Sequence, residues 1–119
     1  MVTKIDKNSL IDMNLMHLIF GNNALGMQDF LKMLIKTATE KFDQIAHDAL
    51  DRNAEAVLNS LHQLKGPVGS SGFMKLYKLC EHMEDQVKDA DWEKLSVTLD
   101  HSRKMVDKLN HEMIKKFNR

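Results

Sequence analysis

Apolar residues recur at steps of three or four positions through four long stretches of this 119-residue chain. On an α-helix that spacing places them on one face, whereas a half-buried strand would alternate apolar and polar residues. No stretch shows strand alternation, and only one proline and five glycines interrupt the helical pattern. The sequence therefore predicts an all-α fold.

Capping residues and one glycine set the expected helix boundaries. Five helices are expected, and they begin near Asp12, at Asn22 or Asn23, at Asn53, near Ser71 and at Asp91. The first helix is expected to end near Gly21, the second near Asp51 and the fourth near Lys88. Four amphipathic helices with short connections can bury their apolar faces only against one another. We therefore expect an antiparallel up-and-down four-helix bundle, with the additional short N-terminal helix over one end. Residues 1–119 are expected to form a single, monomeric domain.

Composition and charge exclude several classes of function. Lys and Arg number 17, as do Asp and Glu, so the chain lacks the basic excess on which nucleic-acid affinity rests. No apolar run reaches the roughly 18 residues of a membrane span, and the N-terminus has no signal-peptide core. The single Cys80 fits a reducing compartment. We expect a cytoplasmic protein with neither a nucleic-acid nor a membrane partner.

The most unusual segment is HQLKGPVGSSG, residues 62–72, where glycines and a proline follow a histidine in an amphipathic helix. On that helix Lys65, Gly66 and Gly69 share the solvent-facing side with His62. A glycine inside a helix costs about 1 kcal/mol relative to alanine, so two on one face suggest that another molecule comes close to the imidazole. The remaining histidines are interpreted as ordinary solvated residues: His17, His47, His82, His101 and His111.

The chemistry of this segment favours a carrier over a catalyst. An imidazole nitrogen is a good nucleophile near neutral pH and can hold a covalent intermediate. A lysine one turn away supplies a cation for an incoming anion such as a phosphoryl group. No general base, oxyanion donor or glycine-rich strand-to-helix loop accompanies the pair, so we expect neither autonomous enzyme activity nor a cofactor.

The spacing His-x-x-Lys-Gly at 62–66, followed by Gly72, resembles the signature of the histidine phosphotransfer (HPt) domain family. The long preceding helix, KLYKLCEHMED after the motif, and DADWEKL at the start of the last helix also match that family. The resemblance implies that His62 accepts a phosphoryl group from a receiver-domain aspartate and passes it to a response regulator, or back. The partner would be the receiver domain of a hybrid histidine kinase, of a response regulator, or of both.

The resemblance also implies roles for residues near the histidine. Lys65 would steady the phosphate, and Gly66, with Gly69, would leave clearance for the docking receiver. Glu84 on the next helix would hydrogen-bond the non-reacting nitrogen of His62 and so orient the ring.

Two positions depart from the family's pattern: Pro67, where Ser or Ala is usual, and Ser71, where an aliphatic residue is common. Proline has no N–H to donate to the Gln63 carbonyl, and it disfavours helix at the residue before it. We expect a kink at this point, not the end of the helix.

Other classes of function fit this sequence less well than a phosphoryl carrier does. A metal-binding bundle is disfavoured because the sequence has no His-x-x-x-His or Glu-x-x-His pair, so no metal is expected.

The serious alternative is a non-transferring interaction module of the same fold that docks receiver or kinase domains. Retention of both His62 and Lys65 speaks against it, since docking alone needs neither. The nine methionines would also suit an adaptable peptide groove, but most are expected in the core or at the edge of the docking patch.

Overall fold

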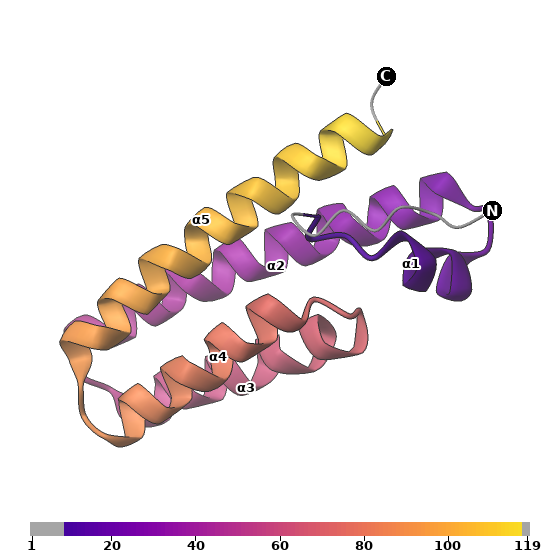
Figure 1. The fold of residues 1–119 in the computed structure, drawn as a ribbon. Coiled ribbons are helices and arrows are strands. Elements are labelled where there is room, and N and C mark those ends of the chain that lie inside the picture. The colour runs from indigo at the N-terminus through magenta and orange to yellow at the C-terminus, as the bar shows by residue number, and fades with distance from the viewer. Residues whose placement is uncertain (1–8, 118–119) are drawn as a thin grey trace.

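The computed structural model describes residues 9–117, and within this range it contains five α-helices and no strand. In chain order they are α1 (Met13–Phe20), α2 (Ala24–Leu50), α3 (Ala54–Ser70), α4 (Met74–Lys88) and α5 (Trp92–Phe117) (Figure 1). The predicted all-α class is confirmed.

Four of the helices begin at side-chain caps. In each case a carboxylate or amide oxygen accepts a hydrogen bond, 2.9–3.2 Å long, from the backbone N–H three positions on. Such a bond satisfies an N–H that has no partner inside the helix. The capping residues are Asp12, Asn23, Asn53 and Asp91, as the sequence predicted.

The start of α4 differs from the prediction, because the helix begins at Met74 and not near Ser71. Gly72 has a φ of +80°, a left-handed conformation that breaks the helical path and that glycine adopts without steric cost. Ser71 instead closes α3: its backbone N–H donates to the carbonyl oxygen of Pro67 at 3.2 Å, and its hydroxyl donates to the same oxygen.

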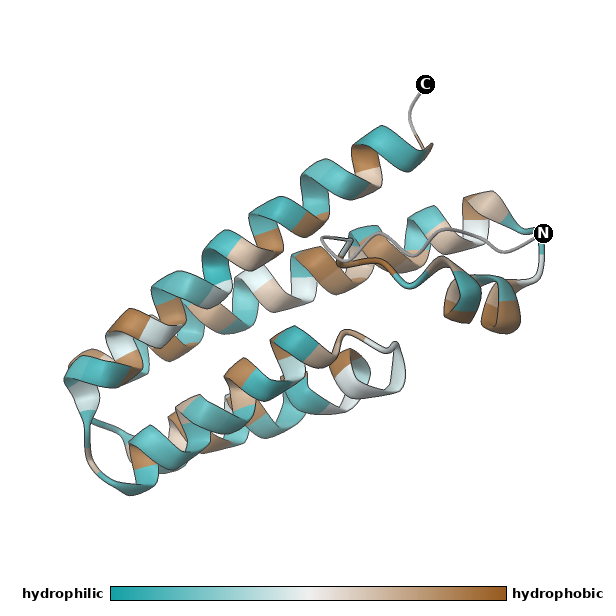
Figure 2. Cartoon of the chain, viewed as in Figure 1, coloured by the Kyte–Doolittle hydropathy of each residue, from teal (hydrophilic) through white to brown (hydrophobic). Residues whose placement is uncertain are grey.

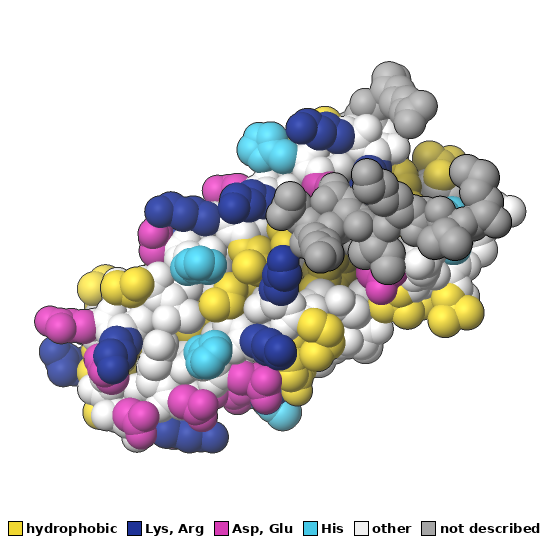
Figure 3. All heavy atoms as spheres, in the orientation of Figure 1, with side chains coloured by type: hydrophobic (Ala, Val, Ile, Leu, Met, Phe, Trp, Pro, Cys, Tyr) yellow, Lys and Arg dark blue, Asp and Glu magenta, His cyan; other side chains and the backbone are white. Residues whose placement is uncertain are grey.

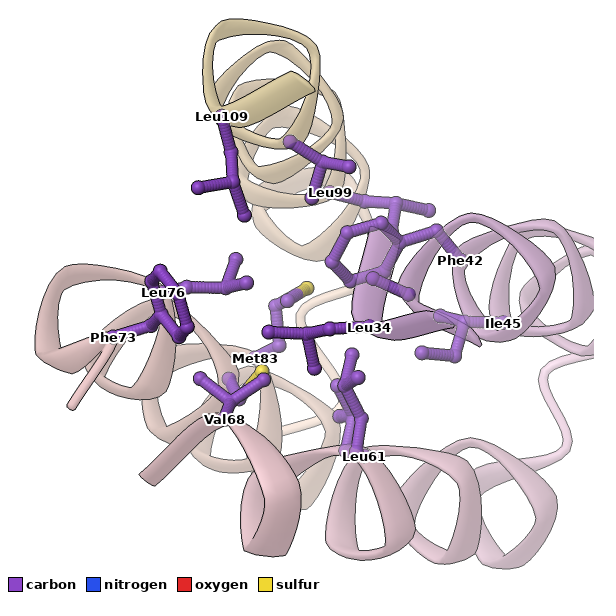
Figure 4. Packing of buried hydrophobic residues seen from close by; sticks show 14 of the residues in the cluster. Leu34, Phe42, Ile45, Leu61, Val68, Phe73, Leu76, Met83, Leu99 and Leu109 are labelled. Atoms are coloured by element: carbon purple, nitrogen blue, oxygen red, sulfur yellow. The ribbon is translucent and has the colours of Figure 1, made fainter. Parts of the chain in front are cut away.

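The four long helices pack as a bundle around one core. α2 packs against α3 and α5, and α4 packs against the same two helices. Figure 1 shows α2 with α5 along one side of the molecule and α3 with α4 along the other. Hydrophobic residues recur along each helix between hydrophilic ones (Figure 2). In Figure 4, Leu34, Leu61, Met83 and Leu99, one from each long helix, point into the shared interior.

The N-terminal part of the described chain packs against two places in the bundle. A Cβ atom built on Gly72 would lie 2.4 Å from Cδ2 of Leu15, so α1 contacts the connection between α3 and α4. Ahead of α1, the backbone N–H groups of Leu10 and Ile11 donate to the Glu112 carboxylate on α5 at 2.8–3.1 Å. Gly72 is therefore required both for its backbone conformation and for the close approach of Leu15.

The part of the chain that the structure describes meets the requirements of neither a membrane-spanning helix nor a metal site. None of the helices at 13–117 is both long and apolar enough to cross a bilayer. Among the same residues, no three His, Cys, Asp or Glu side chains are grouped so that they could hold a metal ion. Acidic and basic side chains are interspersed over the face in Figure 3.

Candidate functional site

The helix that carries the motif continues through its proline. α3 runs past Gly66 and Pro67 and ends at Ser70, so the expectation that Pro67 does not stop the helix is confirmed. The missing N–H of Pro67 removes one bond of the helical ladder. The capping bonds that Ser71 makes to the Pro67 carbonyl then hold the last turn.

His62 lies on the outer side of α3 with its side chain exposed, while its neighbour Leu61 is fully buried. Among the described residues it makes no hydrogen bond or ion pair. By contrast, a ring nitrogen of His17 lies 2.9 Å from the Gly21 carbonyl oxygen. The imidazole of His62 is thus open to a partner on both of its nitrogens.

All five other histidines are exposed, as expected for solvated residues. None of them lines the groove in which His62 lies. His62 therefore differs from them in its surroundings and not in its exposure.

An open groove lies beside His62, between α3 and the start of α4. Its lining residues are His62, Lys65, Gly66, Gly69, Ser70, Met74 and Tyr77. Four of the five predicted site residues thus share one surface. Glu84 does not line the groove, but it is hydrogen-bonded to Lys65, which does.

The methionines divide between the core and the surface. Met16, Met27, Met83 and Met113 are buried. Met74 is 49% exposed and lies at the edge of the groove. Met33 on α2 is 60% exposed and does not line the groove, so the expectation of core and patch-edge methionines holds for most of the methionines and not for all.

The two glycines that face the groove have different surroundings. A Cβ atom built on Gly66 would meet nothing within 4 Å, whereas one on Gly69 would lie 2.9 Å from Cδ2 and 3.0 Å from Cε2 of Tyr77. The expected bare face is therefore open at Gly66, but at Gly69 an aromatic ring rests on the backbone. Tyr77 was not predicted from the sequence, because helical spacing does not reveal which residue of α4 lies opposite Gly69.

Lys65 forms an ion pair that links the two helices. Its Nζ donates to Oε1 of Glu84 at 2.8 Å, and the two side chains are only 22% and 14% exposed. This hydrogen bond to Glu84 raises the pKa of Lys65 above its ordinary value of 10.5, and since that value already lies well above neutral pH, the side chain is an ammonium there. The Tyr77 ring centroid is 5.4 Å from the same Nζ, within the range of a cation–π contact.

The partner of Glu84 differs from the expected one. Glu84 was expected to hydrogen-bond the His62 ring, but among the described residues its hydrogen bond is with Lys65. The reason is the geometry of α3: residue 65 lies further round the helix toward α4 than residue 62 does. The half-buried Lys65 accordingly reaches α4, and His62 stays in solvent.

Cys80 is the other nucleophile close to this cluster, and it is fully buried. Burial raises the pKa of its thiol to about 12. A thiol that remains protonated at neutral pH is a poor nucleophile. In this part of the molecule, His62 is the accessible nucleophile and Cys80 belongs to the core.

The chain matches the model of a known protein family. The family model of the Hpt domain matches residues 29–112, a range that covers more than two thirds of the chain and includes α3, α4 and the whole groove. No curated protein sequence and no solved structure matches the chain.

Proposed function

Because the chain belongs to the Hpt domain family, we propose that it carries phosphoryl groups in a two-component phosphorelay and that His62 is the residue phosphorylated. Hpt domains act in phosphorelays as carriers and not as catalysts, so no kinase activity is assigned to this chain. The single observation that supports His62 most is its position: an exposed imidazole, without a hydrogen-bond partner among residues 9–117, in one groove with the Lys65 ammonium.

The proposed step is an exchange of one bond to phosphorus for another. A nitrogen of the neutral His62 ring attacks the phosphorus of a receiver's aspartyl phosphate, and a nitrogen–phosphorus bond forms. The bond between phosphorus and the aspartate oxygen breaks, and its electron pair leaves with the carboxylate. The reverse step returns the group to a receiver aspartate. Such transfer depends mainly on position and on stabilisation of charge.

Lys65 supplies the positive charge in this proposal. An ammonium has three N–H donors, and Glu84 accepts from Lys65 at 2.8 Å, which leaves other donors for phosphate oxygens. Charge-assisted hydrogen bonds of this kind are stronger than neutral ones. Glu84 is accordingly proposed to hold Lys65 and not to orient the His62 ring.

The proposed partner is the receiver domain of a hybrid histidine kinase or of a response regulator. It would approach over Gly66, where no side chain occupies the surface. We also propose that residues 1–119 form one domain in which α2–α5 are an antiparallel up-and-down bundle. The domain is proposed to be monomeric, because a monomer leaves the groove free for the receiver. The lone Cys80 supports a cytoplasmic location, where thiols stay reduced.

One observation favours a second candidate, a module that docks receiver or kinase domains without transferring phosphate. Lys65 is already paired with Glu84, so part of its charge is neutralised before any phosphate arrives. If that pairing prevents Lys65 from binding phosphate, only the docking surface remains.

Transfer of label distinguishes the two candidates. The full chain is incubated with receiver domains carrying radioactive aspartyl phosphate. If the chain is a phosphoryl carrier, label should move to the wild type and to the control variant His82→Gln, but not to His62→Gln. His82 is a matched control because it is an exposed histidine on α4. The product should be labile in acid, as a phosphoramidate is. Binding of receivers without label on His62 would favour the docking module, and label on His62→Gln would refute the assignment.

A further inference from the structure

We infer that Tyr77 is a positioning residue, which holds the ammonium of Lys65 at the edge of the His62 groove. The inference rests on the proposed phosphoryl-carrier function and names a residue outside the His-x-x-Lys-Gly motif. Three observations support the inference. Tyr77 lines the groove, its ring packs on Gly69, and the ring centroid is close to the Lys65 ammonium.

The contact with Gly69 fixes where the tyrosine ring lies. A Cβ atom at position 69 would come within 2.9–3.0 Å of two ring carbons, closer than non-bonded carbons pack. Any side chain at position 69 would therefore push the ring from its place. The absence of a side chain at Gly69 thus leaves room for the Tyr77 ring, which is half-buried and lines one side of the groove.

The contact with Lys65 gives the fixed ring a consequence for the site. Tyr77 and Glu84 lie seven residues apart and so share one face of α4; both reach the same Nζ. Glu84 attracts the ammonium but competes with phosphate for its charge. The ring attracts the ammonium electrostatically through its π face and carries no net charge that competes with phosphate. Tyr77 therefore restrains Lys65 without neutralising its charge.

The restraint matters because a free lysine side chain has many rotamers. Ordering it costs conformational entropy each time a phosphoryl group binds. Because Tyr77 and Glu84 already limit the rotamers of Lys65, this lysine loses less conformational entropy when a phosphoryl group binds during transfer. Loss of the ring should therefore slow phosphorylation of His62 only through Lys65.

The test measures how fast the full chain is phosphorylated on His62 by phosphoramidate, a small donor that needs no docking. Tyr77→Leu should slow the reaction about two- to fivefold, the range expected for a partly exposed cation–π contact. Tyr77→Phe, which keeps the ring, should restore most of the rate. Gly69→Ala, which displaces the ring, should slow it as Tyr77→Leu does.

A double-variant cycle separates positioning from a purely structural role. In the Lys65→Ala background, Tyr77→Leu should have no further effect, because the residue through which it acts is gone. An equal slowing in both backgrounds, or a Tyr77→Leu rate equal to that of the wild type, would overturn the inference. If Tyr77→Leu does not fold, Gly69→Ala in the two backgrounds decides in its place. Wild type that takes no phosphate on His62 would instead refute the proposed function itself.

Discussion

The Nζ atom of Lys65 on α3 lies 2.8 Å from Oε1 of Glu84 on α4. This ion pair joins the helix that carries His62 to its neighbour, next to the groove. The pair is 22% and 14% exposed at its two side chains, so solvent screens it less than a surface pair. Lys65 thus has a structural partner before any phosphate binds.

Lys65→Ala should slow transfer from a phosphorylated receiver to His62. The change removes one charge-assisted hydrogen bond, worth about 1.5–3 kcal/mol, so we expect a reduction of about 10- to 100-fold without complete loss. Rates of label transfer measure it, with Lys78→Ala, an exposed lysine of α4, as the matched control. Equal rates for the Lys65 and Lys78 variants would mean that the ammonium serves only the link to α4.

Glu84→Gln tests which residue Glu84 positions. The amide keeps an acceptor for the hydrogen bond that raises the pKa of Lys65, but it removes the carboxylate charge, which raises that pKa as well. If Glu84 acts through Lys65, the variant should alter transfer in the wild-type background and have no effect beside Lys65→Ala. A further slowing in the Lys65→Ala background would point back to a role at the His62 ring.

Cys80 should react slowly with iodoacetamide in the folded chain. Burial raises the pKa of the thiol from its ordinary 9.0 to about 12, so at pH 8 the folded chain holds about a thousandfold less thiolate than the unfolded chain. The proton is held more tightly in the folded state. The stability this confers is present below pH 9 and is lost as the pH rises from 9 toward 12. Mass spectrometry of alkylation with and without urea measures the ratio, and equal rates would contradict the burial.

Gly72→Ala should destabilise the fold. Alanine in the left-handed conformation that Gly72 adopts costs about 1–2 kcal/mol, and its Cβ atom would also meet Leu15 at 2.4 Å. We expect the melting temperature to fall by about 5 °C or more. Adding Leu15→Ala should relieve the contact and recover part of the loss relative to the sum of the two single changes. A melting temperature equal to that of the wild type would show that the connection adopts another conformation.

The sequence predicted what depends on a single helix. Apolar spacing and capping residues such as Asn53 gave the number of helices and most of their starts, and helical spacing gave the exposure of His62. The missed features depend on two elements at once. The contact of Tyr77 with Gly69 and the pairing of Lys65 with Glu84 both require the register between α3 and α4, which periodicity within one helix does not contain.

Gly66 allows the stability and the docking role of a glycine to be separated. It lies inside α3, and a Cβ atom there meets nothing within 4 Å. Gly66→Ala should stabilise the fold by less than the roughly 1 kcal/mol that alanine usually gains over glycine inside a helix, because the ring of Pro67 disfavours helix at a preceding residue that carries a Cβ atom. Gly69→Ala provides the matched contrast, because its Cβ atom would displace the Tyr77 ring. Melting temperatures of the two variants should move apart, with position 66 the higher.

The same position should respond in the opposite direction when a receiver is the donor. A side chain at residue 66 lies one turn from His62, where the receiver's aspartate must bring the phosphorus within about 3–3.5 Å of the ring nitrogen. Gly66→Gln should therefore slow transfer from a receiver more than Gly66→Ala does. Both variants should react with phosphoramidate at nearly the wild-type rate, because that small donor needs no docking surface. Full-speed transfer from a receiver to Gly66→Gln would show that the open surface at this glycine is not where the partner lies.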